Sequence, residues 1–233
     1  MLGGLKLIAI LSVGWMVCGC ATAPGPVGSI GPTGHRAAHD TNSGLPQAAS
    51  SIPDSKVLAA VPAGFISFCT RFADQCTAPA NAPATVVLGP AQWQTLEQVN
   101  ESVNQAIRPM DDQKHYGRAE YWNIPTDGYG DCEDYALTKR KELMAAGFPE
   151  PSLRVALVVT WRNERHAVLT VSSDRGDFVL DNLTGEIVGW DKAGYRWVER
   201  QDPTRAWGWV ALGTSSDPTF VASIASQPVS TAR

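Results

Sequence analysis

The stretch that decides the fold is Gly128-Tyr129-Gly130-Asp131-Cys132-Glu133-Asp134-Tyr135-Ala136, a glycine-containing loop that leads into a predicted helix. The helix is expected over residues 132–146, with acidic residues in its first turn and basic residues later. Gly147 and Pro149 follow it, and a glycine and then a proline commonly end a helix. Cys132 therefore begins a helix, where backbone N–H groups and the positive end of the dipole stabilise a thiolate.

The carboxylates around this cysteine disfavour the thiolate. Asp131, Glu133 and Asp134 raise the pKa of a nearby thiol unless a cation neutralises them. A histidine cation or a bound metal ion would do so. A lone cysteine at a helix start is more often an inert packing residue, so the loop by itself leaves its role open.

A histidine and an aspartate later in the chain fit such a cysteine. His166 begins an apolar strand directly after the polar turn 162–164, and the following strand ends in Asp181. Adjacent antiparallel strands can place these side chains together, with Asp181 holding one imidazole nitrogen while the other faces Cys132. This is the nucleophile, base and orienting acid of a catalytic triad.

The remaining pattern predicts an α+β domain. Apolar residues recur at spacings of three and four over residues 93–107, between two prolines, which predicts an amphipathic helix. Helices followed by an antiparallel meander are typical of the α+β class. Strands are expected over residues 153–161, 166–171, 178–181, 186–190 and 195–199.

The N-terminus predicts export to the periplasm or cell envelope. Lys6 precedes the apolar run 7–17, which is too short to cross a bilayer but suits a signal peptide over residues 1–23. Cleavage after 21–23 and a lipoprotein-type box over 17–20 both remain open, and the second would leave Cys20 lipidated. An uncleaved anchor is the third alternative.

Composition divides the rest of the chain. Residues 24–60 are rich in Ala, Pro, Gly and Ser and predict a disordered tether, and residues 213–233 predict a flexible tail. The folded domain is expected over residues 61–212. The net charge of −4 and the lack of a basic cluster argue against a nucleic-acid partner.

Export also bears on the five cysteines. Two belong to the leader, and an oxidising compartment favours a disulfide between Cys69 and Cys76. Cys132 is left as a single thiol, either buried as a packing residue or reactive.

Four segments together resemble the bacterial transglutaminase-like cysteine proteinases: Tyr121-Trp122, residues 130–136, residues 166–169 and residues 180–183. The likeness extends over about 65–209. It implies a papain/transglutaminase-like α+β fold, with the nucleophile at a helix N-terminus packed on an antiparallel β-sheet. It also implies that Cys132 is the nucleophile, His166 the base and Asp181 the orienting acid.

The resemblance carries further expectations. A member of that family is a calcium-binding periplasmic protease that releases a biofilm adhesin, which implies calcium ligands at Asp131 and Glu133 and an inner-membrane regulatory receptor. The two carboxylates could instead complement the helix dipole. No cofactor is required for the chemistry itself.

We therefore expect an exported thiol peptidase that hydrolyses peptide bonds of a cell-surface or periplasmic protein. Membrane contact is expected only through the lipid anchor at Cys20. The alternatives are an amide-transferring enzyme, in which an amine captures the acyl-enzyme, and a catalytically silent calcium-binding module of the same fold.

Overall fold

The computed structural model describes residues 44–212, except 54, 78 and 80. The predicted signal peptide, with Cys20, and the predicted tail lie outside the described residues. Within that part of the chain, no helix has both the length and the apolar character that crossing a bilayer requires.

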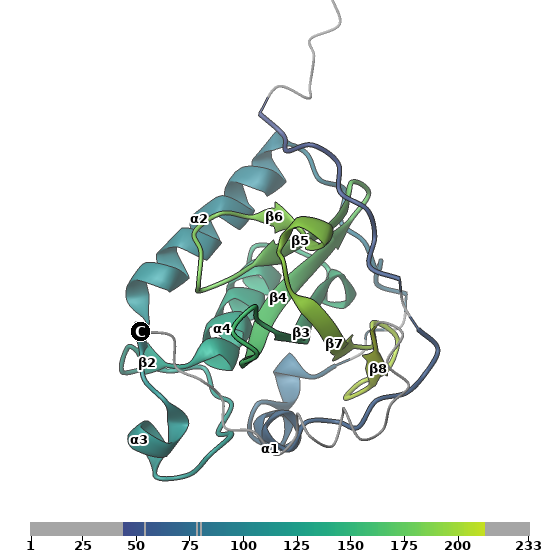
Figure 1. Cartoon of the computed structure of the whole chain (residues 1–233). Coiled ribbons are helices and arrows are strands. Elements are labelled where there is room, and N and C mark those ends of the chain that lie inside the picture. Colours follow the sequence, from purple (N-terminus) through teal and green to yellow (C-terminus); the bar gives the residue numbers. More distant parts are fainter. Residues whose placement is uncertain (1–43, 54, 78, 80, 213–233) are drawn as a thin grey trace, which may run out of the picture. The chain divides into compact units, whose positions relative to one another are not determined.

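A six-stranded antiparallel sheet forms the centre of the domain (Figure 1). The strand order is β6-β5-β4-β3-β7-β8. The predicted meander is correct from β3 to β6, but β7 leaves it and pairs with the opposite edge of β3. The bounds are β3 Leu153–Val159, β4 Arg165–Ser173, β5 Gly176–Leu180, β6 Val188–Gly189, β7 Arg196–Gln201 and β8 Trp209–Ala211.

Two of the helices were predicted from the sequence. They are α2, Pro90–Ala106, and α4, Cys132–Ala145. Shorter elements were not predicted, because each is too short to show a helical or strand period in the sequence and depends on distant contacts. They are the helices α1 Ala63–Arg71 and α3 Asp112–Tyr116, the parallel pair β1 Arg108–Pro109 and β2 Tyr129–Gly130, and the 3-10 turns η1 Ala73–Gln75, η2 Glu150–Ser152 and η3 Trp190–Lys192.

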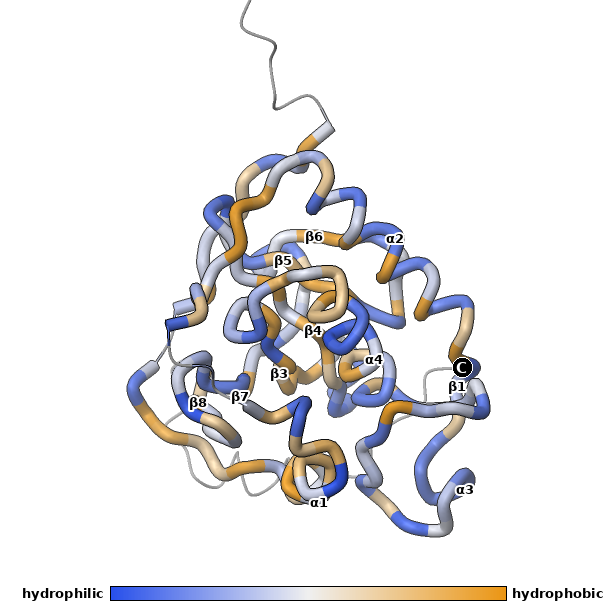
Figure 2. The backbone as a smooth tube through the Cα atoms, turned by 180° about the vertical axis from the view of Figure 1, so that it is seen from behind, coloured by the Kyte–Doolittle hydropathy of each residue, from blue (hydrophilic) through white to orange (hydrophobic). Residues whose placement is uncertain are grey.

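Both faces of the central strands are buried, and successive side chains of β3 enter different clusters. Val155 and Leu157 pack with residues of α1, α2 and α4, whereas Ala156 and Val158 pack with the aromatic segment 190–197. This alternation is the period of two of a β-strand. Figure 2 shows apolar positions along β3 and β4 and hydrophilic ones around α3.

Three packed aromatic rings hold α1 against the loop that precedes α4. Phe65 meets Trp122 and Trp209 edge to face, at centroid distances of 5.9 Å and 5.5 Å. All three side chains are almost fully buried. Gly64 is required here, because a Cβ at this position would lie 2.3 Å from the Trp122 ring. The packing fixes Trp122, which lies beside the candidate site described below.

The N-terminal segment differs from its prediction. The tether expected over residues 24–60 ends earlier, because residues 49–52 bind along the β4–β5 hairpin. Asp177 accepts a hydrogen bond from the backbone N–H of Ile52, whose side chain is buried. Arg200 donates to the Ile52 carbonyl and pairs with Asp177 at 3.4 Å. Hydrogen bonds between a buried ion pair and the backbone of Ile52, together with burial of the Ile52 side chain, hold this segment in place despite its loop-like composition.

The predicted disulfide between Cys69 and Cys76 is confirmed. It is tied to the main helix by Arg140, whose buried guanidinium donates to the carbonyl of Gln75 and to that of Leu153. The disulfide loop, α4 and the start of β3 therefore share one buried cation.

Candidate active site

Cys132 is the first residue of α4, where the sequence predicted it. Its side chain is 94% shielded from solvent, with a relative exposure of 6%. The thiol donates a hydrogen bond to Glu133 Oε2 at 3.1 Å, and the backbone N–H of Ala167 is directed at the sulfur. The loop before α4 thus delivers the sulfur to the first turn of the helix, next to strand β4.

His166 and Asp181 meet as predicted, across two neighbouring antiparallel strands. His166 lies near the start of β4 and Asp181 directly follows β5, in a register that pairs Leu169 with Leu180. Since the carboxylate can only accept, His166 Nε2 donates to Asp181 Oδ1, at 2.8 Å. Both residues are buried. This bond commits Nε2 to the carboxylate and leaves Nδ1 for another partner, while the Cys132 thiol is hydrogen-bonded to Glu133 and not to His166 in the described residues.

The Asp181 carboxylate is held on both oxygens. Oδ1 also accepts from the backbone N–H of Leu183 at 3.0 Å, and Oδ2 accepts from the Tyr195 hydroxyl. Burial by itself would raise the pKa of Asp181, but the hydrogen bonds from His166 and Tyr195 hold it below its ordinary value. Asp181 is therefore a carboxylate at neutral pH and can orient an imidazole.

Cys132 and His166 line the same small cavity. Trp122 contributes to its wall, and Glu120 and Arg165, which also line it, pair at 3.2 Å. The lining residues are Glu120, Trp122, Cys132, Glu133, Leu157, Val158, Arg165, His166 and Ala167. A substrate group entering this cavity would meet both Cys132 and His166.

The protonation of the thiol follows from its neighbours. Burial raises the pKa of Cys132 well above its ordinary value, and the charges of Glu133 and Asp131 raise it further. The thiol accordingly points to the Glu133 carboxylate. Activation requires the negative charge of this region to be offset, either by the imidazolium of His166 or by a bound cation.

An acidic cluster lies beside the nucleophile. Asp112, Asp131 and Glu133 each offer an oxygen, and the three oxygens lie within 4.8 Å of one another. All three side chains are buried, and Asp112 Oδ1, Asp131 Oδ1 and Glu133 Oε1 accept no hydrogen bond from the described residues. Desolvation and the charge of Asp112 raise the pKa of Asp131 to about 7. Buried, unpartnered carboxylate oxygens suit a hard cation that takes oxygen ligands.

Sequence reasoning found two members of this cluster and missed Asp112, which precedes Asp131 by 19 residues. The parallel pairing of β1 with β2 brings it there: the backbone of Met110 donates to the Gly130 carbonyl. No local sequence pattern predicts that pairing, because each of these strands has only two residues.

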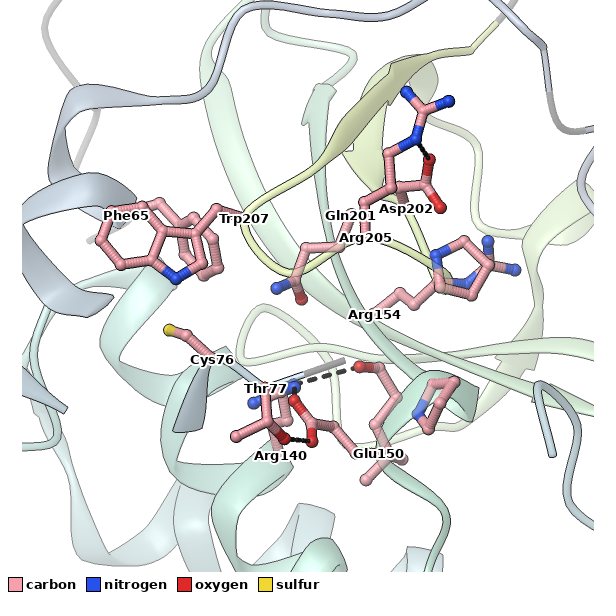
Figure 3. A pocket seen from close by; sticks show the side chains of 13 residues that line it. Phe65, Cys76, Thr77, Arg140, Glu150, Arg154, Gln201, Asp202, Arg205 and Trp207 are labelled. Atoms are coloured by element: carbon pink, nitrogen blue, oxygen red, sulfur yellow. Dashed lines mark hydrogen bonds and ion pairs between the residues drawn. The ribbon is translucent and has the colours of Figure 1, made fainter. Parts of the chain in front are cut away.

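A second small cavity lies between the disulfide loop and the β7–β8 turn (Figure 3). Arg205 pairs with Asp202 on one side of it, and Arg140 pairs with Glu150 on the other. None of the three predicted catalytic residues lines this cavity.

Comparison with known protein families gives a match. The sequence profile of the bacterial transglutaminase-like cysteine proteinases matches residues 55–217, well over half of the chain. The chain belongs to this family. It is therefore a cysteine peptidase with the transglutaminase-like α+β fold, as the resemblance implied.

Solved structures give a weaker likeness. Legionella pneumophila LapG is 26% identical, with a TM-score of 0.45, and the match covers 57% of this chain and 77% of that one. Its calcium-bound form is 23% identical, with a TM-score of 0.45 and coverages of 68% and 86%. The EGTA-treated form is 24% identical, with a TM-score of 0.42 and coverages of 57% and 77%. No curated protein matches the chain, and the assignment to the bacterial transglutaminase-like cysteine proteinases rests on the family profile.

Proposed function

We propose that this chain is an exported thiol peptidase that hydrolyses peptide bonds of a cell-surface or periplasmic protein, with Cys132, His166 and Asp181 as its triad. The observation that carries the proposal is the His166–Asp181 hydrogen bond at 2.8 Å, in the wall of the cavity that also contains Cys132. A binding module would have no physical need for an oriented imidazole beside a thiol.

The chemistry follows from these positions. Nδ1 of His166 takes the thiol proton, and the Cys132 sulfur attacks the peptide carbonyl carbon. Backbone N–H groups at the start of α4 are suited to bind the oxyanion. His166 then gives its proton to the leaving amine, and a thioester remains. Water, deprotonated by His166, releases the acid product and restores the thiol.

Asp112, Asp131 and Glu133 are proposed to hold a calcium ion. When bound, such an ion supplies positive charge beside the nucleophile, where carboxylates otherwise raise the pKa of Cys132. The unpartnered oxygens of the three carboxylates support the proposal.

Export is supported by the disulfide between Cys69 and Cys76. Disulfides form and persist in oxidising compartments such as the periplasm. Lipidation at Cys20 and an inner-membrane regulatory receptor remain proposals of the sequence and its family resemblance.

The triad is tested with iodoacetamide and peptide mapping of Cys132 at pH 7. We expect labelling in the native protein to exceed that in the denatured chain, and to fall at least about tenfold in His166→Ala. His115→Ala is the matched control, since His115 pairs with Asp127 and does not line the cavity. Equal rates in the native protein and the His166 variant would refute the triad.

The calcium site is tested by titration calorimetry and thermal unfolding, without an activity assay. We expect one calcium ion to bind and to raise Tm, and Asp112→Asn to weaken binding at least about tenfold. Glu97→Gln, on the exposed face of α2, removes one carboxylate elsewhere and should bind as the native chain does. Undiminished binding by Asp112→Asn would remove Asp112 from the site.

The substrate is sought by comparing the surface and secreted proteins of a strain carrying the native chain with one carrying Cys132→Ala. A protein shed only in the presence of the native chain identifies the target. Conversion of the same protein into a cross-linked form would indicate amide transfer instead of hydrolysis.

A further inference from the structure

We propose that Tyr195 is a positioning residue of the triad: its hydroxyl holds the second carboxylate oxygen of Asp181, so that the first stays directed at His166. This inference rests on the proposed function. Tyr195 lies between η3 and β7, far from the cysteine and histidine motifs in sequence, and no local pattern marks it.

The contacts of Asp181 carry the argument. His166 Nε2 and the Leu183 N–H both bind Oδ1, which leaves Oδ2 to the Tyr195 hydroxyl. A carboxylate bound at one oxygen can still rotate about its Cβ–Cγ bond, whose preferences are broad. A donor on the other oxygen fixes that rotation, and with it the direction in which the imidazole is held.

The rings around the carboxylate add to this restraint. Tyr195 meets the His166 ring edge to face, with centroids 5.8 Å apart, so it contacts the base as well as its carboxylate. Trp161, from the β3–β4 turn, stacks parallel to Tyr195 at 6.2 Å and is itself 69% exposed. The phenol of Tyr195 therefore packs between the His166 imidazole and an exposed indole.

The turn before β7 delivers the phenol to this place. Gly194 has a φ of +71°, in the left-handed region that glycine adopts at little cost. Burial, followed by the charge of Asp181, raises the pKa of Tyr195, so the hydroxyl remains protonated and can only act as a donor toward the carboxylate. Tyr195 therefore holds Asp181 and does not exchange protons with substrate.

Other charged groups act on the same region, and the test must leave them in place. Lys139 of α4 interacts with Asp181 from within the core. The cavity side of His166 carries Glu120, Glu133 and Arg165. Tyr195→Phe alters none of these charges, because phenol and benzene rings are both neutral at pH 7.

The experiment uses the full chain with calcium present and two measurements. One is the iodoacetamide rate at Cys132 at pH 7. The other is the low-field ¹H resonance of the proton on His166 Nε2, assigned in ¹⁵N-histidine-labelled protein with His166→Gln. In Tyr195→Phe we expect a rate about tenfold lower, since loss of one hydrogen bond to a charged group is about that large. We also expect the resonance to move upfield or broaden through exchange.

Tyr135→Phe is the matched control. Its hydroxyl donates to the Ile107 carbonyl at 2.6 Å in the same domain but does not contact the triad. It should lower Tm while leaving the resonance and the rate as they are. Trp161→Leu is a second variant at an exposed position, where folding is safe, and should lower the rate about twofold to threefold by admitting water to the Tyr195–Asp181 bond.

The outcomes separate the two proposals. A folded Tyr195→Phe, or failing that a Trp161→Leu, with an unchanged resonance and an unchanged rate overturns the role of Tyr195 and leaves the triad intact. A native chain whose Cys132 reacts no faster than in the denatured state overturns the triad itself, whatever the Tyr195 variants do.

Discussion

Replacing Lys139 with methionine should make this protein more stable. Lys139 lies in the middle of α4 and is completely buried, and its ammonium nitrogen donates no hydrogen bond to any of the described residues. Methionine has a similar length and no charge, so it can fill the same space. The variant removes a buried cation without opening a cavity.

The size of the gain follows from the pKa. Burial lowers the pKa of Lys139 from 10.5 to about 7, and the charge of Asp181 offsets only part of this effect. That lowering corresponds to about 5 kcal/mol of lost stability at neutral pH, as an order of magnitude. Between pH 7 and pH 10.5 the unfolded chain binds this proton and the folded chain does not. The free energy of unfolding of the native chain therefore rises with pH across that window, and below it the Lys139 penalty is present in full and no longer varies with pH.

Urea denaturation from pH 6 to pH 10 checks the prediction. The variant should exceed the native chain by several kcal/mol at pH 7, and the difference should shrink to about 1 kcal/mol at pH 10. Subtracting the two curves cancels every other titrating group. Lys141→Met, on the exposed side of the same helix, is the control and should give parallel curves. A Lys139 variant that is less stable than the native chain, or whose advantage does not depend on pH, would refute the reasoning.

Three further variants test the packing. Gly64→Ala should cost about 1–3 kcal/mol and shift the tryptophan emission, because its methyl group would meet the Trp122 ring; urea unfolding followed by fluorescence measures both. Replacing Cys69 and Cys76 with alanine should cost about 2 kcal/mol, and a reductant should lower the Tm of the native chain but not that of the double variant. Arg140→Met removes the cation that pairs with Glu150 and the donor to the carbonyls of Gln75 and Leu153, and a loss of about 3–5 kcal/mol in urea is expected, whereas a loss below 1 kcal/mol would contradict the buried role.

The sequence predicted those parts of the fold in which local pattern and tertiary structure agree. Helix α2 has a clear apolar period between two prolines, and the β4–β5 hairpin consists of two apolar runs around a turn that contains a glycine, so both were found. The position of Cys132 followed from the charges and stop signals of α4. The placement of His166 beside Asp181 followed from strand adjacency alone.

What sequence reasoning missed depends on pairings between distant segments. Asp112 reaches the acidic cluster through two-residue strands, and Tyr195 reaches Asp181 through a loop after the 3-10 turn η3. The pairing of β7 with the far edge of β3 was missed for the same reason. Periodicity reports burial within one element, whereas these contacts are decided by how elements are placed against each other.

The proposed base His166 and its carboxylate Asp181 belong to a single hairpin and are separated by only 15 residues, whereas the Cys132 sulfur lies on a helix that must dock from outside. Contacts that are close in sequence tend to form early in folding. We therefore expect an oriented imidazole before there is a competent nucleophile, which pulsed hydrogen exchange during refolding can verify. A partly folded copy would then be unable to cleave other proteins, and peptidase activity would appear only once the whole domain has folded.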